Sequence, residues 1–305
     1  GKNIIGYGEG DRIFSFFKDE PIVGGFITSF YLLTVGYLFE KSKNKNYIKN
    51  YLILLISCIF LLAIIFTGER SNGIKALIMF VIFYLLIDNF SIKQKIISLF
   101  LILVIFFIIA LNSDFLKKRY YEQFIKLFSS KDAIIKTYNS IKGEYFASPL
   151  EFSNNNKRQF GKNESQRDVI YFKLYSSGIE VFKRHLIFGV GNKNYGFETC
   201  YEKRHWYAYI CSGHPHQTYI ELLAEHGTVG TIIILSIIFY MLFQILKTIQ
   251  RSKNKIQIAA FLFILISFVP LLPSGSFFGD YSITLFFINF SLMFAANKSS
   301  NIFSE

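Results

Sequence analysis

Two histidines, His214 and His216, stand on either side of Pro215 and are the side chains of this sequence best suited to proton transfer. A neutral imidazole accepts a proton from a hydroxyl group near neutral pH. Apolar spacing predicts a short amphipathic helix over residues 218–226, and Gly227 suits its C-terminal cap. We therefore expect His216 to lie at the mouth of a helix bundle as a general base, with His214 in support.

The same two histidines also raise the question of a metal. They are two residues apart, and a zinc site usually requires three or four ligands. The sequence therefore favours acid–base chemistry at His214 and His216, and we expect no metal there.

Three arginines form a second group of candidate residues: Arg12, Arg70 and Arg167. A guanidinium group offers forked donors that match the oxygens of a phosphate. Each arginine taken singly is more often an anchor at a membrane edge. A binding role becomes the better interpretation if the fold brings the arginines and the histidines to one face.

The elements that must position these residues are predicted from composition. Of 305 residues, 52% are hydrophobic, and Phe (36) and Tyr (19) are unusually frequent. The apolar residues cluster into runs close to the roughly 17–25 residues that cross a bilayer. The sequence therefore predicts an all-α integral membrane protein, a helical bundle of about seven spans: 22–39, 50–66, 73–88, 96–111, 228–246, 256–272 and 281–296.

Positive charges in the short loops predict the orientation. Lysine and arginine concentrate after the first, third and fifth apolar runs and are nearly absent from the alternate loops. By the positive-inside rule, the basic loops and the C-terminus are cytoplasmic. Residues 1–21 and 112–217 then face the periplasm of a bacterial inner membrane. The net charge of +12 is thereby explained by topology and anionic partners, so we expect no nucleic acid.

Residues 112–217 are too many for a simple connector. We therefore divide the chain into membrane residues 1–111, a large periplasmic loop 112–217, and membrane residues 218–305. Helical spacing is present over 120–135 and 169–188, with an irregular connector over 153–166. Within the loop, Cys200 and Cys211 either form a disulfide or remain free thiols, and the sequence favours neither.

At this point the residues resemble a known family. The stretch from His214 to Gly230 is similar to the signature of the O-antigen ligase and O-antigen polymerase superfamily, although Gln217 stands where asparagine is commonest. Four further segments match in order: the one around Arg12, the turn Thr67-Gly68-Glu69-Arg70-Ser71, the helix from Arg167 with its later Gly189-Val190-Gly191, and Pro273-Ser274-Gly275-Ser276-Phe277-Phe278. The chain begins with Gly, and we expect the family's early membrane segments to precede it.

The resemblance implies a fold similar to class C glycosyltransferases and a reaction at the periplasmic face. Members transfer a glycan from undecaprenyl diphosphate, without cofactor or metal, to lipid A-core in ligases or to a growing glycan in polymerases. His216, with His214, would be catalytic. Arg70, Arg167 and Arg12 would bind the diphosphate. Membrane lipids would surround the spans. We take the ligase activity as the first hypothesis and the Wzy-type polymerase as its alternative.

Two other classes compete with glycosyl transfer. A transporter of lipid-linked glycans would place ionisable residues within its spans, whereas the apolar runs here carry almost none. A non-catalytic scaffold would use the large loop only to bind partners and would not require His216 or Arg70.

Overall fold

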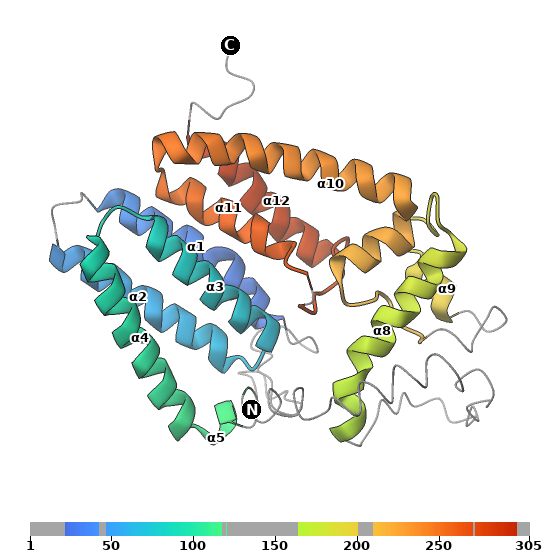
Figure 1. Cartoon of the computed structure of the whole chain (residues 1–305), viewed down its shortest axis with the longest axis horizontal. Coiled ribbons are helices and arrows are strands. Elements are labelled where there is room, and N and C mark those ends of the chain that lie inside the picture. The colour runs from blue at the N-terminus through green and yellow to red at the C-terminus, as the bar shows by residue number, and fades with distance from the viewer. Residues whose placement is uncertain are drawn as a thin grey trace, which may run out of the picture. The chain divides into compact units, whose positions relative to one another are not determined.

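A computed structural model describes residues 22–42, 47–117, 120, 164–200, 210–270 and 272–297, and it leaves out the side chains of residues 164–170 and 172. Throughout this part of the chain the regular structure is helical, which confirms the all-α membrane fold (Figure 1). The helices are α1 (Val23–Lys41), α2 (Tyr47–Phe66), α3 (Arg70–Leu86), α4 (Ile92–Asn112), α5 (Asp114–Leu116), α8 (Glu164–Arg184), α9 (Tyr195–Cys200), α10 (Thr218–Ser252), α11 (Lys255–Ser267) and α12 (Asp280–Ala295).

The seven predicted apolar runs correspond in order to α1, α2, α3, α4, α10, α11 and α12. Of the described helices, α1, α2, α4 and α10 are long and apolar enough to cross a membrane, while α11 and α12 are apolar but shorter. The chain is therefore a multi-pass membrane protein. The predicted helix over 120–135 lies outside the described residues except for residue 120, and the connector predicted over 153–166 lies outside them up to residue 163. The predicted helix over 169–188 is observed as α8, which begins five residues earlier and ends at Arg184, four residues before the predicted end. Residues 164–166, predicted to be irregular, therefore belong to this helix.

The chain folds into two compact units. The first unit comprises residues 1–121, 238–269 and 283–305, and the second comprises residues 122–237 and 270–282. The division of the chain at residues 111 and 217 that the sequence suggests stays a prediction.

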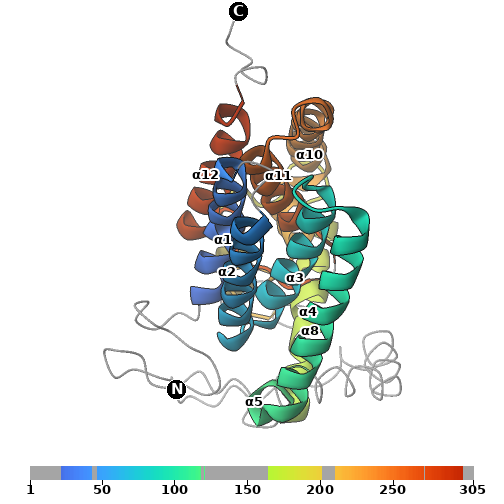
Figure 2. The ribbon, with the colours of Figure 1, turned by 90° about the vertical axis from the view of Figure 1, so that its left-hand side faces the viewer.

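Helix α1 is the centre of the first unit and packs against α2, α3 and α11 (Figure 2). The absence of a side chain at Gly36 permits this packing, because a Cβ atom there would lie 2.7 Å from the carbonyl oxygen of Lys255. Tyr31 of α1 shares a 2.8 Å hydrogen bond with Ser57 of α2. Small residues and polar pairs between helices are the usual means of packing where the surroundings are as apolar as the side chains.

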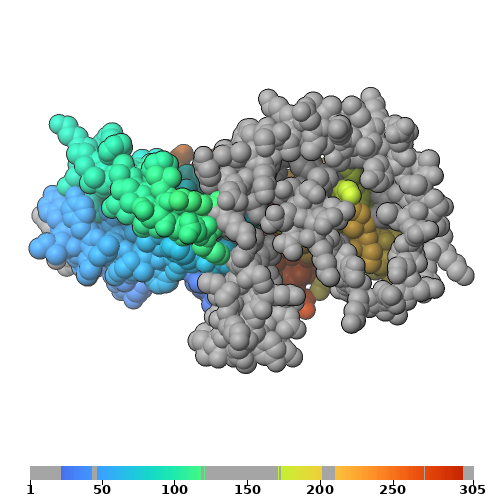
Figure 3. All heavy atoms as spheres, turned by 90° about the horizontal axis from the view of Figure 1, so that it is seen from below, coloured from blue at the N-terminus to red at the C-terminus, as the bar shows by residue number. Residues whose placement is uncertain are grey.

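Helix α4 differs from α1 because none of its residues is buried. Its apolar side chains lie on the surface of the first unit, beside α2 (Figure 3). Ser91 and Gln94 form a capping box at its start, and Tyr84 of α3 shares a 2.7 Å hydrogen bond with Ser98. A helix that is apolar on every side suits a lipid environment.

The turn between α2 and α3 is fastened to the start of α1 by a carboxylate. Glu69 accepts hydrogen bonds from the backbone amides of Gly24 at 2.6 Å and Gly25 at 3.2 Å, and from the side-chain amide of Asn72 at 2.6 Å. The first amides of a helix have no partner within the helix, so an acceptor supplied by a distant residue stabilises α1. Glu69 thereby also fixes the position of Arg70, the first residue of α3.

We predict that Glu69→Ala lowers the free energy of unfolding by about 1–2 kcal/mol, because two helix amides lose their acceptor. Thermal unfolding of the detergent-solubilised protein measures this loss. Glu180→Ala is the control, since Glu180 forms only a surface ion pair with Lys183, and its loss should cost no more than about 0.5 kcal/mol. Equal effects of the two variants would contradict the capping role of Glu69.

Candidate functional site

Helix α10 is two helices separated at Gly227. It has 35 residues and would be about 52 Å long if straight, whereas the apolar core of a bilayer is about 30 Å thick. Gly227 interrupts the helix with φ 63° and ψ −168°, a conformation that side-chain-bearing residues avoid. The apolar run 228–246 follows this break and is the membrane-crossing part. Residues 218–226 precede it as a separate short helix, as the sequence predicted.

The break at Gly227 frees backbone groups, and residues 186–191 pair with them. A Cβ atom on either Gly189 or Gly227 would collide with the backbone of the facing segment, so both glycines are required for this close approach. Four backbone hydrogen bonds join the segments: Val190 N to Ala224 O at 3.0 Å, Gly191 N to Glu225 O at 2.8 Å, Thr228 N to Leu186 O at 2.8 Å and Val229 N to Ile187 O at 3.2 Å. The Gly-Val-Gly element is thus the partner of the helix break.

Glu225 strengthens the same junction from the helix side. Its two carboxylate oxygens accept the backbone amides of Lys193 at 3.0 Å and Tyr195 at 3.3 Å. Tyr195 is the first residue of α9, so Glu225 caps that helix. The carboxylate of Glu225 therefore has a structural role.

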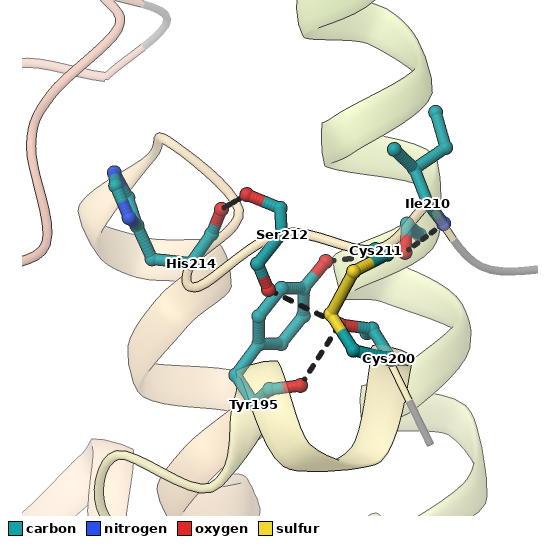
Figure 4. Close-up of a disulfide and its surroundings, with 8 residues drawn as sticks. Tyr195, Cys200, Ile210, Cys211, Ser212 and His214 are labelled. Atoms are coloured by element: carbon teal, nitrogen blue, oxygen red, sulfur yellow. Dashed lines mark hydrogen bonds between the residues drawn. A yellow bond between two sulfur atoms is a disulfide. The ribbon is translucent and has the colours of Figure 1, made fainter. Parts of the chain in front are cut away.

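A disulfide fixes the approach of the chain to the histidines (Figure 4). Cys200 and Cys211 are bonded, with their Cα atoms 4.5 Å apart, which decides the alternative that the sequence left open. Next to the bridge, the hydroxyl of Thr199 donates to the carbonyl of Ser212 at 3.1 Å. The hydroxyl of Ser212 in turn donates to the carbonyl of His214 at 2.9 Å.

Helix α8 passes close to the histidine segment because it has small residues there. A Cβ atom on Gly178 would collide with the side chain of Ile220 and lie 2.9 Å from Pro215. One residue earlier in α8, the hydroxyl of Ser177 accepts a hydrogen bond from the backbone amide of Ile210 at 3.1 Å. Ser177 and Gly178 therefore hold α8 against the chain at Ile210 and at Pro215.

The structure brings the two predicted histidines together. The ring centroids of His214 and His216 are 4.0 Å apart. The ring centroids of Tyr171 and His216 are 5.9 Å apart, in an edge-on arrangement. His216 has φ 58°, a left-handed conformation that is uncommon for a residue other than glycine. Its carbonyl accepts the backbone amide of Ser274 at 2.9 Å. Within the described part of the chain, no three His, Cys, Asp or Glu side chains are placed to hold a metal ion together.

His214 is neutral at neutral pH. Burial, and secondarily the neighbouring charge of His216, lowers the pKa of His214 to about 4, against a smaller opposing effect of the Ser274 backbone. Its buried Nε2 atom has no hydrogen-bond partner among the described residues. A neutral ring at this position places no positive charge beside His216.

The amide side chain of Gln217 caps the short helix that follows. Its Oε1 atom accepts the backbone amide of Ile220 at 2.8 Å, and its carbonyl accepts the amide of Glu221 at 2.9 Å. Asparagine is a stronger N-cap in general, but glutamine supplies the same acceptor here. The residue after His216 therefore positions the backbone at the start of the helix.

Glu221 is a site residue that the sequence analysis did not single out for chemistry. It is fully buried, and its oxygens accept the Ser276 hydroxyl at 2.5 Å and the Phe277 amide at 2.8 Å. Burial raises the pKa of Glu221 to about 7, and these hydrogen bonds oppose the rise. Its four-residue spacing from Glu225 was visible in the sequence, but its partners lie more than fifty residues away.

The arginines are placed less completely than the histidines. Arg70 opens α3 in the first unit and is half-buried. Arg167 lies in α8, four residues before Tyr171, and its side chain is outside the described residues, as is the whole of Arg12. Tyr171 itself was recognised in the sequence only as part of an aromatic helical pattern.

We predict that acidification destabilises the protein partly through His214. Because the pKa of His214 is about 4 when folded and 6.5 ordinarily, the unfolded chain binds a proton between these values that the folded chain does not. The stabilising contribution is therefore complete above about pH 6.5 and is lost as the pH falls towards 4. Melting temperatures of wild type and His214→Gln between pH 4 and 7 measure it. The raised pKa of Glu221 has the opposite effect on stability, but it is the same in wild type and in His214→Gln. Melting temperatures that change in parallel with pH in the two proteins would therefore contradict the prediction.

Comparison of the sequence with known protein families identifies the family of this chain. The profile of the O-antigen ligase family matches residues 53–235, more than half of the chain, including both histidines, Arg70 and Arg167. A search of curated proteins finds no match. The helix break, the Gly-Val-Gly element and the histidine pair all fall inside the matched region. The chain belongs to the O-antigen ligase family.

Proposed function

We propose that this protein is a glycosyltransferase of the O-antigen ligase type. It transfers a surface glycan from undecaprenyl diphosphate to a hydroxyl of lipid A-core at the periplasmic face of a bacterial inner membrane. The histidine pair supports the proposal best, because His214 and His216 lie in contact at the start of the short helix that leads into the membrane-crossing part of α10. Such a position near the membrane edge gives a lipid-linked donor and an acceptor hydroxyl access to the same imidazole.

His216 is the general base of the proposed reaction. Its neutral ring takes the proton of the acceptor hydroxyl, and the hydroxyl oxygen forms a bond to the anomeric carbon of the donor. The bond between that carbon and the diphosphate oxygen breaks, and the undecaprenyl diphosphate leaves with the electron pair. His214, with its pKa lowered to about 4, stays neutral beside His216 and adds no charge that would disfavour its protonation.

The arginines balance the charge of the leaving group. A diphosphate concentrates negative charge as the glycosidic bond breaks, and a guanidinium fork stabilises it through paired hydrogen bonds. Arg70, Arg167 and Arg12 are the proposed residues for this task. We propose no cofactor or metal.

Orientation supports the same assignment. The basic loops that follow the first, third and fifth apolar runs support a cytoplasmic location for those loops and hence a periplasmic one for the histidines. The prenyl tail of the donor would lie against the Phe-rich spans, and the C-terminus would be cytoplasmic.

A Wzy-type polymerase is the alternative within the same family, since only the acceptor differs. Supplying purified protein with lipid-linked donor and either lipid A-core or a second lipid-linked repeat separates the two activities. Formation of either product in detergent micelles, where no bilayer has to be crossed, would exclude a mere transporter. Failure to form any product would exclude both enzymes.

We predict that His216→Ala lowers the rate of glycan transfer by roughly 10²–10⁴-fold, because the proton acceptor is lost. Product formation by the protein with all of its natural membrane segments measures the rate. His185→Ala is the matched control and should retain activity. His185 belongs to the same unit, directly follows α8 and lies 3.6 Å from a carboxylate oxygen of Glu198. Unchanged transfer by His216→Ala would remove His216 as the base.

We predict that Arg70→Lys weakens donor binding about tenfold, a loss of about 1.4 kcal/mol, since the charge remains but the fork does not. Binding of undecaprenyl diphosphate in micelles measures the affinity. Arg251→Lys, an exposed change at the end of α10, is the control. Wild-type affinity in Arg70→Lys would exclude Arg70 from the diphosphate site.

A further inference from the structure

The left-handed backbone of His216 needs support from its surroundings. A non-glycine residue with φ near 58° is strained, and such a conformation persists only where neighbouring contacts fix it. One contact that reaches this residue's backbone is the 2.9 Å hydrogen bond from the Ser274 amide to the His216 carbonyl. The position of the His216 ring therefore depends on where residues 272–279 are held.

Glu221 holds those residues. Its Oε1 atom accepts the hydroxyl of Ser276 at 2.5 Å, and its Oε2 atom accepts the amide of Phe277 at 2.8 Å. The carboxyl group is fully buried, so no water competes for these bonds. A second contact, 3.2 Å between the hydroxyls of Thr218 and Ser274, joins the same two segments closer to the histidine.

These contacts close a ring of covalent and hydrogen bonds around His216. From His216 the chain passes to Gln217, whose side chain caps the short helix, and one turn later reaches Glu221. From Glu221 the ring continues through Phe277 and back along the turn to Ser274, which bonds to His216. Removing both acceptor oxygens of Glu221 opens this ring at the point farthest from the imidazole.

We propose that Glu221 is a positioning residue for His216, acting through residues 272–279 rather than through contact with substrate. The proposal rests on the proposed function of His216 as the base. Both carboxylate oxygens are occupied by donors, so Glu221 is not itself placed to accept a proton from a hydroxyl of a substrate. A leucine of similar size accepts neither bond, whereas a glutamine would keep both, because the Ser276 hydroxyl can also accept from an amide N–H.

Glu221→Leu tests the proposal, with Glu225→Leu as its matched control. Both residues are buried carboxylates one turn apart in the same helix, but Glu225 bonds to Lys193 and Tyr195 instead of the turn. We expect Glu221→Leu to lower kcat roughly ten- to a hundredfold while KM for the donor stays unchanged, because the base is displaced and the diphosphate site is not. Glu225→Leu leaves the backbone pairing at Gly227 intact, so it should keep its kcat per folded molecule, even where its melting temperature falls.

A double-mutant cycle provides the second measurement. Ser276→Ala removes one of the two bonds to Glu221, so its effect on kcat should largely disappear when Glu221 is already Leu. Combined with Glu225→Leu, the effect of Ser276→Ala should persist in full. Additive effects in the first pair, an unchanged kcat in Glu221→Leu, or equal losses of kcat in both glutamate variants would each overturn the proposal.

His216→Ala, measured in the same assay, separates the two levels of inference. If His216→Ala keeps its activity, the base assignment fails, whatever Glu221 does. If His216→Ala loses activity and Glu221→Leu does not, the base assignment stands and the positioning role alone fails.

Discussion

A helix broken beside a membrane-crossing run leaves backbone amides and carbonyls that must find partners, because an unpaired polar group in apolar surroundings is costly. At Gly227 this demand is met by residues 186–191, whose backbone pairs with both sides of the break. The short helix of residues 218–226 then has a fixed direction, and the histidines that precede it have a fixed place. The rest of the candidate site depends on this one junction.

Carboxylate side chains serve the architecture repeatedly in this chain. Glu69 accepts the first amides of α1, Glu225 accepts the amide that opens α9, and Glu221 accepts an amide and a hydroxyl of residues 272–279. In each case a side chain satisfies backbone groups that lie far away in the sequence. These three carboxylates are therefore structural, and the proposed proton transfer is assigned to the imidazoles.

The two histidines lie in different environments. His214 is kept neutral by burial, whereas His216 carries the strained backbone and the contact with Tyr171. The proposed division of labour follows from this difference, because a base works best when its neighbour does not oppose its positive charge. The disulfide between Cys200 and Cys211 limits the conformations of the chain just before the two histidines, and so holds their rings in these different environments.

The sequence by itself determined the helical membrane class, the order of the apolar helices, the break at Gly227 and the histidines, because each depends on local composition or spacing. The exact start of α8 and the length of α10 differed from the predicted ranges, since packing and capping extend helices beyond their apolar runs. Only the tertiary structure decided that Cys200 and Cys211 are bonded, that Gln217 caps a helix and that Glu221 holds Phe277. Those outcomes depend on distances between residues that are remote in the chain, and no local pattern encodes such distances.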